Sequence, residues 1–200
     1  MTEEIEAKSF VVPVTEERRK LKSLKYTLYC SSVVNELDDK IFSKADEHRV
    51  IGKGGWACCV IDNKEKKMIM CGKKEMVTNY KMQITAVIQG LKWILSEYES
   101  NIRKHVQIQI YTDSVLVVNF LRDWITHWKR EDNTIDDTRP NSSELSELSN
   151  LISQINFDAK TNLSWIPKDG NEIMKQLLAL SIKARNDSEN EVEEENEEKY

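Results

Sequence analysis

No apolar run in the sequence approaches the roughly 20 residues that a helix needs to span a bilayer. The first residues, Met1 to Lys8, are acidic and polar, whereas a signal peptide is basic and then apolar. These absences predict a soluble, intracellular protein, nuclear or cytoplasmic, with no membrane partner. The length of 200 residues allows one core of ordinary size, so a single domain with tails is expected.

The sequence also lacks the cysteine spacing of a metal site. Its four cysteines contain no C-x-x-C pair, and Cys58 and Cys59 are adjacent in an apolar stretch. Zinc ligation and disulfides are therefore disfavoured, and the three histidines are too scattered to add ligands. The thiols expected to be buried and reduced are Cys30, Cys58, Cys59 and Cys71.

Acidic residues are concentrated at the C-terminal end. Asn186 to Tyr200 contains eight acids and one lysine, so this segment carries a charge of −7, the rest +2, and the whole chain −5. With almost no apolar side chain to bury, residues 186–200 are expected to form a disordered acidic tail. Residues 1–24 are expected to form a partly flexible extension. Its basic residues Arg18, Arg19 and Lys20 are expected either to contact phosphates or an acidic protein surface, or to be exposed to solvent alone.

Between these tails, residues 25–185 alternate between strand and helix patterns. Five segments have the composition or alternation of strands: Lys25 to Val34, Trp56 to Asp62, Met68 to Lys73, Val106 to Tyr111 and Leu163 to Ile166. Four segments follow a helical period: Thr78 to Tyr98, Val117 to Trp128, Ser143 to Gln154 with Ser142 or Ser143 as N-cap, and Ile173 to Arg185. The order predicts an α/β protein with a mixed five-stranded sheet, βββαβα, an extra helix, then βα, with helices on its faces.

Several short motifs resemble the type 1 ribonuclease H family. They occur in the expected order as Tyr26-Thr27, Gly54-Gly55-Trp56, Thr78 to Gln83, Tyr111 to Ser114, Trp124 to Lys129, Trp165 to Pro167 and Asn171-Glu172. The resemblance covers about residues 25–185 and implies a ribonuclease H-like fold.

The resemblance also implies two Mg²⁺ ions held by four acids. At the positions matched to those acids, this chain has Leu28, Gln83, Asp113 and Lys175. One carboxylate cannot neutralise two divalent cations, so we expect no metal, no cofactor and no enzymatic activity, as in a pseudoenzyme. The loop acids expected to be ordinary surface residues are Asp38, Asp39, Asp46 and Asp169.

We expect a lysine to replace the metal as the partner of the remaining acid. The ammonium of Lys175 should pair with Asp113, Leu28 should pack beside them, and Gln83 should hydrogen-bond one of the two. Candidate contacts to nucleic acid or a partner protein are Asn79, Lys81, Trp124, Trp128, Lys129 and Arg130. Asn79 is expected equally as a cap at the N-terminus of its helix, and the two tryptophans are also expected in or near the core.

These features predict a non-catalytic subunit that scaffolds or binds protein partners in a nucleic-acid-processing complex. A DNA or RNA methyltransferase, a ribosomal or a splicing assembly is suggested by analogy alone. One alternative is an autonomous binder of duplex or RNA/DNA hybrid, against which the charge of only +2 outside the tail argues. Another is an active ribonuclease H with a rearranged metal site.

Overall fold

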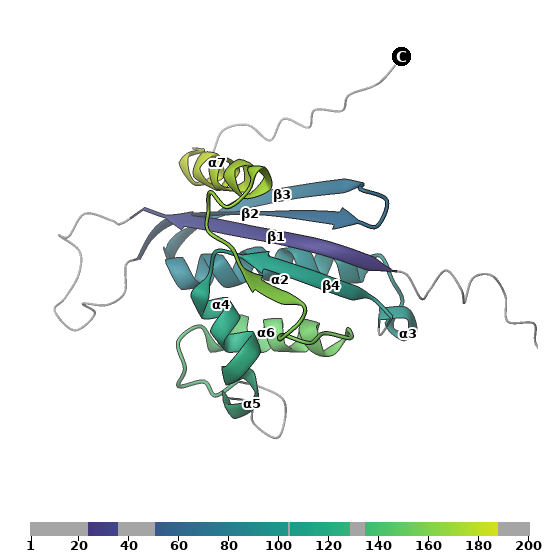
Figure 1. The fold of residues 1–200 in the computed structure, drawn as a ribbon. Coiled ribbons are helices and arrows are strands. Elements are labelled where there is room, and N and C mark those ends of the chain that lie inside the picture. The colour runs from purple at the N-terminus through teal and green to yellow at the C-terminus, as the bar shows by residue number, and fades with distance from the viewer. Residues whose placement is uncertain (1–23, 36–50, 104, 129–134, 188–200) are drawn as a thin grey trace, which may run out of the picture.

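The computed structural model describes residues 24–35, 51–103, 105–128 and 135–187 (Figure 1). Several expectations fall outside these ranges: most of the extension and of the acidic tail, the basic residues Arg18, Arg19, Lys20, Lys129 and Arg130, and the loop acids Asp38, Asp39 and Asp46.

The described chain forms one mixed five-stranded sheet, as the sequence predicts. The strands are β1 (Lys25–Val34), β2 (Ile51–Asp62), β3 (Lys67–Thr78), β4 (Gln107–Thr112) and β5 (Leu163–Trp165). Their order across the sheet is β3-β2-β1-β4-β5. β1, β2 and β3 pair antiparallel, whereas β4 lies parallel to both β1 and β5. β2 begins five residues before its predicted start, at Ile51, and β3 ends five residues after its predicted end, at Thr78. Both strands are longer because they continue to pair across a bulge near Gly52.

Helices cover both faces of the sheet (Figure 1). α7 (Glu172–Asn186) packs on one face against β1, β2 and β3, and α2 (Asn79–Ser96) packs on the other. α6 (Ser142–Ser153) lies against α2. None of the helices in the described ranges has both the length and the apolar content that crossing a membrane requires.

Three local details differ from the sequence prediction. The single helix expected up to Trp128 is divided into α4 (Val115–Asn119), a π-helical turn η3 (Phe120–Trp124) and α5 (Ile125–Trp128). A short helix α3 (Ser100–Arg103) precedes β4. The N-cap of α6 is Asn141, with a left-handed φ of 59°, because asparagine tolerates that conformation better than the expected Ser142 or Ser143.

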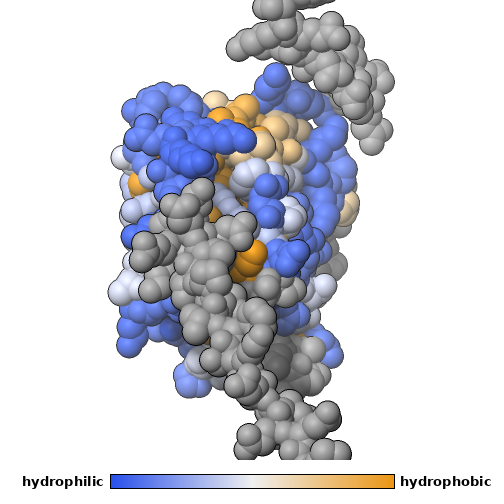
Figure 2. All heavy atoms as spheres, turned by 90° about the vertical axis from the view of Figure 1, so that its right-hand side faces the viewer, coloured by the Kyte–Doolittle hydropathy of each residue, from blue (hydrophilic) through white to orange (hydrophobic). Residues whose placement is uncertain are grey.

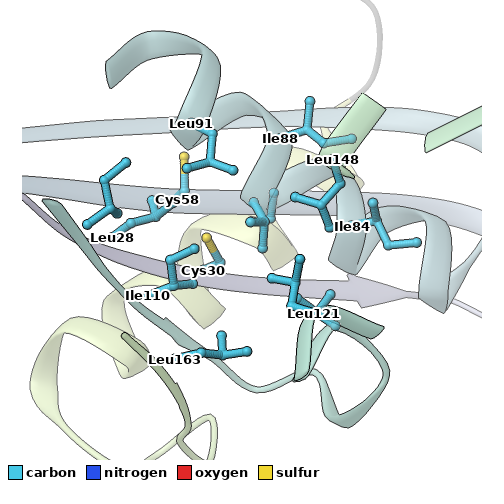
Figure 3. Close-up of a cluster of buried hydrophobic side chains, with 14 of the residues drawn as sticks. Leu28, Cys30, Cys58, Ile84, Ile88, Leu91, Ile110, Leu121, Leu148 and Leu163 are labelled. Atoms are coloured by element: carbon cyan, nitrogen blue, oxygen red, sulfur yellow. The ribbon is translucent and has the colours of Figure 1, made fainter. Parts of the chain in front are cut away.

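The main core lies between the sheet and α2, α4 and α6 (Figure 3). Leu28 is completely buried there, in the middle of β1. The backbone of Gly90 in α2 lies directly against it, since a Cβ at Gly90 would be 2.3 Å from Leu28 Cδ1. The absence of a side chain at Gly90 therefore lets α2 approach the sheet over Leu28.

Three of the four cysteines are buried as predicted, but Cys71 is exposed. The correction follows from the sheet order, because Cys71 lies on the edge strand β3, whereas Cys30 and Cys58 lie on inner strands. Burial raises the pKa of the Cys58 thiol to about 12, so that thiol stays protonated at neutral pH.

Candidate nucleic-acid interface

The candidate site lies at the carboxyl ends of β1 and β4, where Asp113 follows the last residue of β4. The parallel register places Cys30 opposite Thr112, so the next residue along each strand, Ser31 and Asp113, are neighbours. Ser31 Oγ donates a hydrogen bond to Asp113 Oδ2 at 2.9 Å. Ser31 and Asp113 form the centre of the site.

The Asp113 carboxylate is almost completely buried, with 4% of its side chain exposed. Burial raises the pKa of Asp113 above its ordinary value. Hydrogen bonds from Ser31 and from the backbone N–H groups of Asp113 and Ser32 oppose this shift, as does the charge of Lys168. Desolvation outweighs them, so the carboxylate remains a poorly solvated charge held by several donors.

The structure changes which residue of β1 belongs to this site. Sequence matching assigns the position of the first family acid to Leu28, but Leu28 is buried in the core against Gly90, away from the end of β1. Ser31, three residues later, contacts Asp113 instead. The expectation that Leu28 packs beside Asp113 is wrong, because the parallel pairing of β1 with β4 places Ser31, and not Leu28, next to Asp113.

The cation that contacts Asp113 also differs from the prediction. Lys175 is exposed on α7, and the ion pair of Asp113 is formed by Lys168, whose Nζ lies 3.8 Å from Asp113 Oδ2. Lys168 Nζ also donates to the backbone oxygen of Ser32 at 2.9 Å. Lys168 belongs to the segment between β5 and α7, which crosses the end of the sheet, so it reaches the site before α7 begins. Nearby Asp169 is exposed, as expected.

Gln83 connects the first turns of α2 to the same end of the sheet. Its Oε1 accepts a hydrogen bond from Ser114 Oγ at 2.7 Å, and Ser114 Oγ in turn caps α4 by accepting from the Val117 N–H. Gln83 therefore bonds Ser114, rather than Asp113 or Lys175 as predicted.

The N-terminus of α2 presents polar side chains beside the site. Thr78, not Asn79, is the N-cap, because its side chain accepts from Lys81 N, and this leaves Asn79 exposed. Lys81 is held by an ion pair to Glu144 of α6, with Nζ and Oε1 2.6 Å apart. Asn79 is therefore available to a ligand, whereas the charge of Lys81 already has a partner.

Two exposed aromatic residues, Trp165 at the site and Tyr80 in the first turn of α2, were not predicted as site residues. Trp165, 52% exposed at the end of β5, donates from Nε1 to the backbone oxygen of Asp113 at 3.2 Å. Tyr80, also 52% exposed, lies in the first turn of α2. A large aromatic side chain left in solvent beside a buried carboxylate, as Trp165 is beside Asp113, is a binding signal that the motifs alone did not supply.

Trp124 and Trp128 form a second aromatic group on η3 and α5. Their rings stack with centroids 4.8 Å apart, and both are partly buried against the main core, as predicted. The guanidinium of Arg139 lies 4.9 Å from the centre of the Trp128 ring, a cation–π arrangement. The neighbouring Lys129 and Arg130 lie outside the described residues.

The two-metal site that the family resemblance implies does not fit the residues present. Within the described ranges, no group of three or more His, Cys, Asp or Glu side chains is placed to hold a metal ion. Around Asp113 the structure instead provides a hydroxyl from Ser31 and an ammonium from Lys168. Magnesium requires several oxygen ligands in near-octahedral geometry, and these residues do not supply them.

Comparisons with known proteins agree on one family. The family model described as RNase H matches residues 41–174. A protein named Ribonuclease H from Wolbachia sp. subsp. Drosophila simulans is 34% identical over 136 residues, which are 66% of this chain and 85% of the relative. A protein of the same name from Ehrlichia ruminantium is 40% identical over 79 residues, 39% of this chain and 47% of the relative.

Solved structures show the same fold at low sequence identity. LC9-RNase H1 is similar with a TM-score of 0.63 and 13% identity, over 82% of this chain and 72% of that chain. LC11-RNase H1 in complex with RNA/DNA hybrid is similar with a TM-score of 0.51 and 11% identity, over 79% and 96% of the two chains. The fold prediction is confirmed.

The prediction that this chain has no enzymatic activity is contradicted. Its relatives, including one matched over 85% of its length, are named Ribonuclease H, which is the name of an enzyme. The prediction relied on four positions matched to the family acids. One of them, Leu28, lies against Gly90 in the core, and Ser31 contacts Asp113 instead. A count of carboxylates at aligned positions is therefore insufficient to separate this chain from its relatives.

Proposed function

The chain belongs to the RNase H family, and from this membership and its site we propose that it binds RNA/DNA hybrids at the carboxyl ends of β1 and β4. The observation that carries the proposal is the grouping of Ser31, Asp113 and Lys168 with exposed Trp165. LC11-RNase H1, which shares the fold, has been solved with a hybrid bound.

The chemistry of the site suits a nucleic-acid backbone. Lys168 has an ammonium whose side chain is 40% exposed, and Asn79 offers an amide at the positive end of the α2 dipole. Trp165 and Tyr80 provide aromatic faces that can pack on sugars or bases. Because the charge outside the acidic tail is only +2, we expect moderate affinity and a strong dependence on salt.

Fluorescence anisotropy with a labelled RNA/DNA hybrid tests the proposal, with DNA duplex of the same sequence as competitor. We expect the hybrid to bind more tightly than the DNA duplex, and Tyr80→Ala to weaken hybrid binding by about tenfold, as loss of one aromatic contact does. Ile69→Ala, which removes an exposed side chain from the edge strand β3, is the matched control. The RNA strand is examined for cleavage in the same samples, since the relatives are named for that activity. Absence of hybrid binding at low salt would refute the proposal.

A second role as a subunit of a nucleic-acid-processing assembly is supported by other exposed apolar side chains. Ile69 on β3 and Ile182 on α7 are 46% and 37% exposed. Figure 2 shows that the end of the molecule with the β2–β3 turn is largely hydrophilic, with a hydrophobic patch near its top. We propose that a protein partner covers the exposed side chains of Ile69 and Ile182. We expect a stoichiometric partner to co-purify with the wild type and with Lys64→Glu, a control in the β2–β3 turn, but not with Ile69→Asp or Ile182→Asp. A chain that purifies alone would count against this role.

A further inference from the structure

Lys168 is positioned as an internal counter-ion of Asp113. It comes from the segment after β5, and its Nζ bridges the backbone oxygen of Ser32 at 2.9 Å and Asp113 Oδ2 at 3.8 Å. Asp113 is 4% exposed at its side chain, whereas Lys168 is 40% exposed. The pair therefore consists of a buried anion covered by a cation that still reaches solvent.

Several groups already act on the Asp113 carboxylate. A carboxylate has about four lone-pair positions. Ser31 Oγ and the backbone N–H groups of Ser32 and Asp113 itself act on this group, in addition to the charge of Lys168. A metal ion at Asp113 would compete with these donors, and it would stand beside an ammonium of the same sign.

The other polar groups near Asp113 do not compensate. Ser31 is neutral, and the Gln83 side-chain oxygen already accepts from Ser114 Oγ. A divalent ion bound by the single carboxylate of Asp113 would therefore keep at least one positive charge that the other described residues of the site do not neutralise. That charge would lie next to the ammonium of Lys168. The ammonium satisfies the carboxylate without this repulsion.

We propose that Lys168 is the built-in cation of this site, which neutralises Asp113 where family enzymes use divalent ions and offers its exposed side to a backbone phosphate of bound nucleic acid. The first half depends only on the site, whereas the phosphate contact rests on the proposed function. Binding of nucleic acid at this site is then independent of divalent ions.

Calorimetric titration of the full chain with Mn²⁺ tests the first half without nucleic acid. Wild type and Asp113→Asn should take up Mn²⁺ equally, because ions bound elsewhere, including those on the acidic residues 186–200, are common to both proteins. Mn²⁺ uptake by the wild type that disappears in Asp113→Asn would overturn the proposal. Failure of hybrid binding would leave this result valid, so the two proposals are separable.

Hybrid binding measured in EDTA and in Mg²⁺ tests the second half. Wild-type affinity should agree between the two buffers within about twofold. Lys168→Met, which keeps the aliphatic stem, should bind about tenfold more weakly, the effect of one charge-assisted hydrogen bond, and Lys168→Arg should bind nearly as wild type. Lys64→Met, an exposed lysine in the β2–β3 turn at the other end of the sheet, is the matched control. Magnesium-dependent binding by the wild type, or equal affinities for Lys168→Met and Lys64→Met, would overturn it.

Discussion

Ser31 and Asp113 lie side by side on adjacent parallel strands, and the Ser31 hydroxyl donates a 2.9 Å hydrogen bond to the Asp113 carboxylate. This contact defines which position of β1 lies next to the Thr112-Asp113-Ser114 motif. It also separates the site from Leu28, which is buried in the core three residues earlier.

The first prediction concerns this assignment. Ser31→Asp should place a second carboxylate against Asp113 and create a site for Mn²⁺ that calorimetry detects in the variant and not in the wild type, because two carboxylates favour a divalent ion. Leu28→Asp should fail to fold, since it buries a charge without a partner in the main core. A folded Leu28→Asp protein that gains Mn²⁺ affinity would show that Leu28 is the true site position.

The second prediction concerns the close approach of α2 to β1. Leu28→Ala should lower the free energy of unfolding by about 2–5 kcal/mol through loss of buried apolar volume. Gly90→Ala should also destabilise, because the new Cβ would lie 2.3 Å from Leu28 Cδ1. The double variant should be less destabilised than the sum of the two changes, as measured by urea unfolding. Additive effects would mean that the two residues do not share this space.

The third prediction is a pH dependence from Asp113. Because its folded-state pKa is raised, the folded protein holds the proton more tightly than the unfolded chain. The associated stability is present below the unfolded pKa, about 3.9, and is lost as the pH rises through the folded pKa. Unfolding free energies of wild type and Asp113→Asn should therefore diverge from about pH 4 upward, to the disadvantage of the wild type. Divergence in favour of the wild type would mean that Lys168 and Ser31 outweigh burial.

The fourth prediction concerns Trp165, which combines an exposed ring with a hydrogen bond to the Asp113 backbone. Trp165→Ala should weaken hybrid binding by about tenfold through loss of aromatic contact. Trp165→Phe keeps a ring but loses the donor, so it should retain most of the affinity. Anisotropy titrations at one salt concentration measure both, and an equal loss in the two variants would assign the effect to the Nε1 hydrogen bond instead.

Patterns local in the sequence predicted most of the fold. The periodic spacing of Ile84, Val87, Ile88 and Leu91 identified α2, and each of these side chains is buried. Alternation identified β4, because Ile108 and Ile110 face the core while Gln107 and Gln109 do not. The π-helical turn η3 was missed, since a shift in backbone hydrogen bonding leaves the apolar positions of that segment on one side.

The site was predicted less completely, because its contacts join distant parts of the chain. Asp113 was identified from its motif at the end of β4, but its partner on β1 depends on the parallel register, which no local pattern specifies. Lys168 was missed because the path of the segment between β5 and α7 brings it to the site. The preference for Lys175 came from position matching, which gives the order of residues along α7 and not the side chain that reaches Asp113.

Hydrogen exchange of the full chain with and without an RNA/DNA hybrid tests the proposed interface most directly. We expect the hybrid to slow amide exchange in residues 79–83, 112–114 and 163–168, which meet at the carboxyl ends of β1 and β4, and to leave the β2–β3 turn unchanged. The same change should be absent with Tyr80→Ala under conditions where that variant does not bind. Protection confined to residues 62–67, or no protection at hybrid concentrations that saturate anisotropy, would contradict the proposed site.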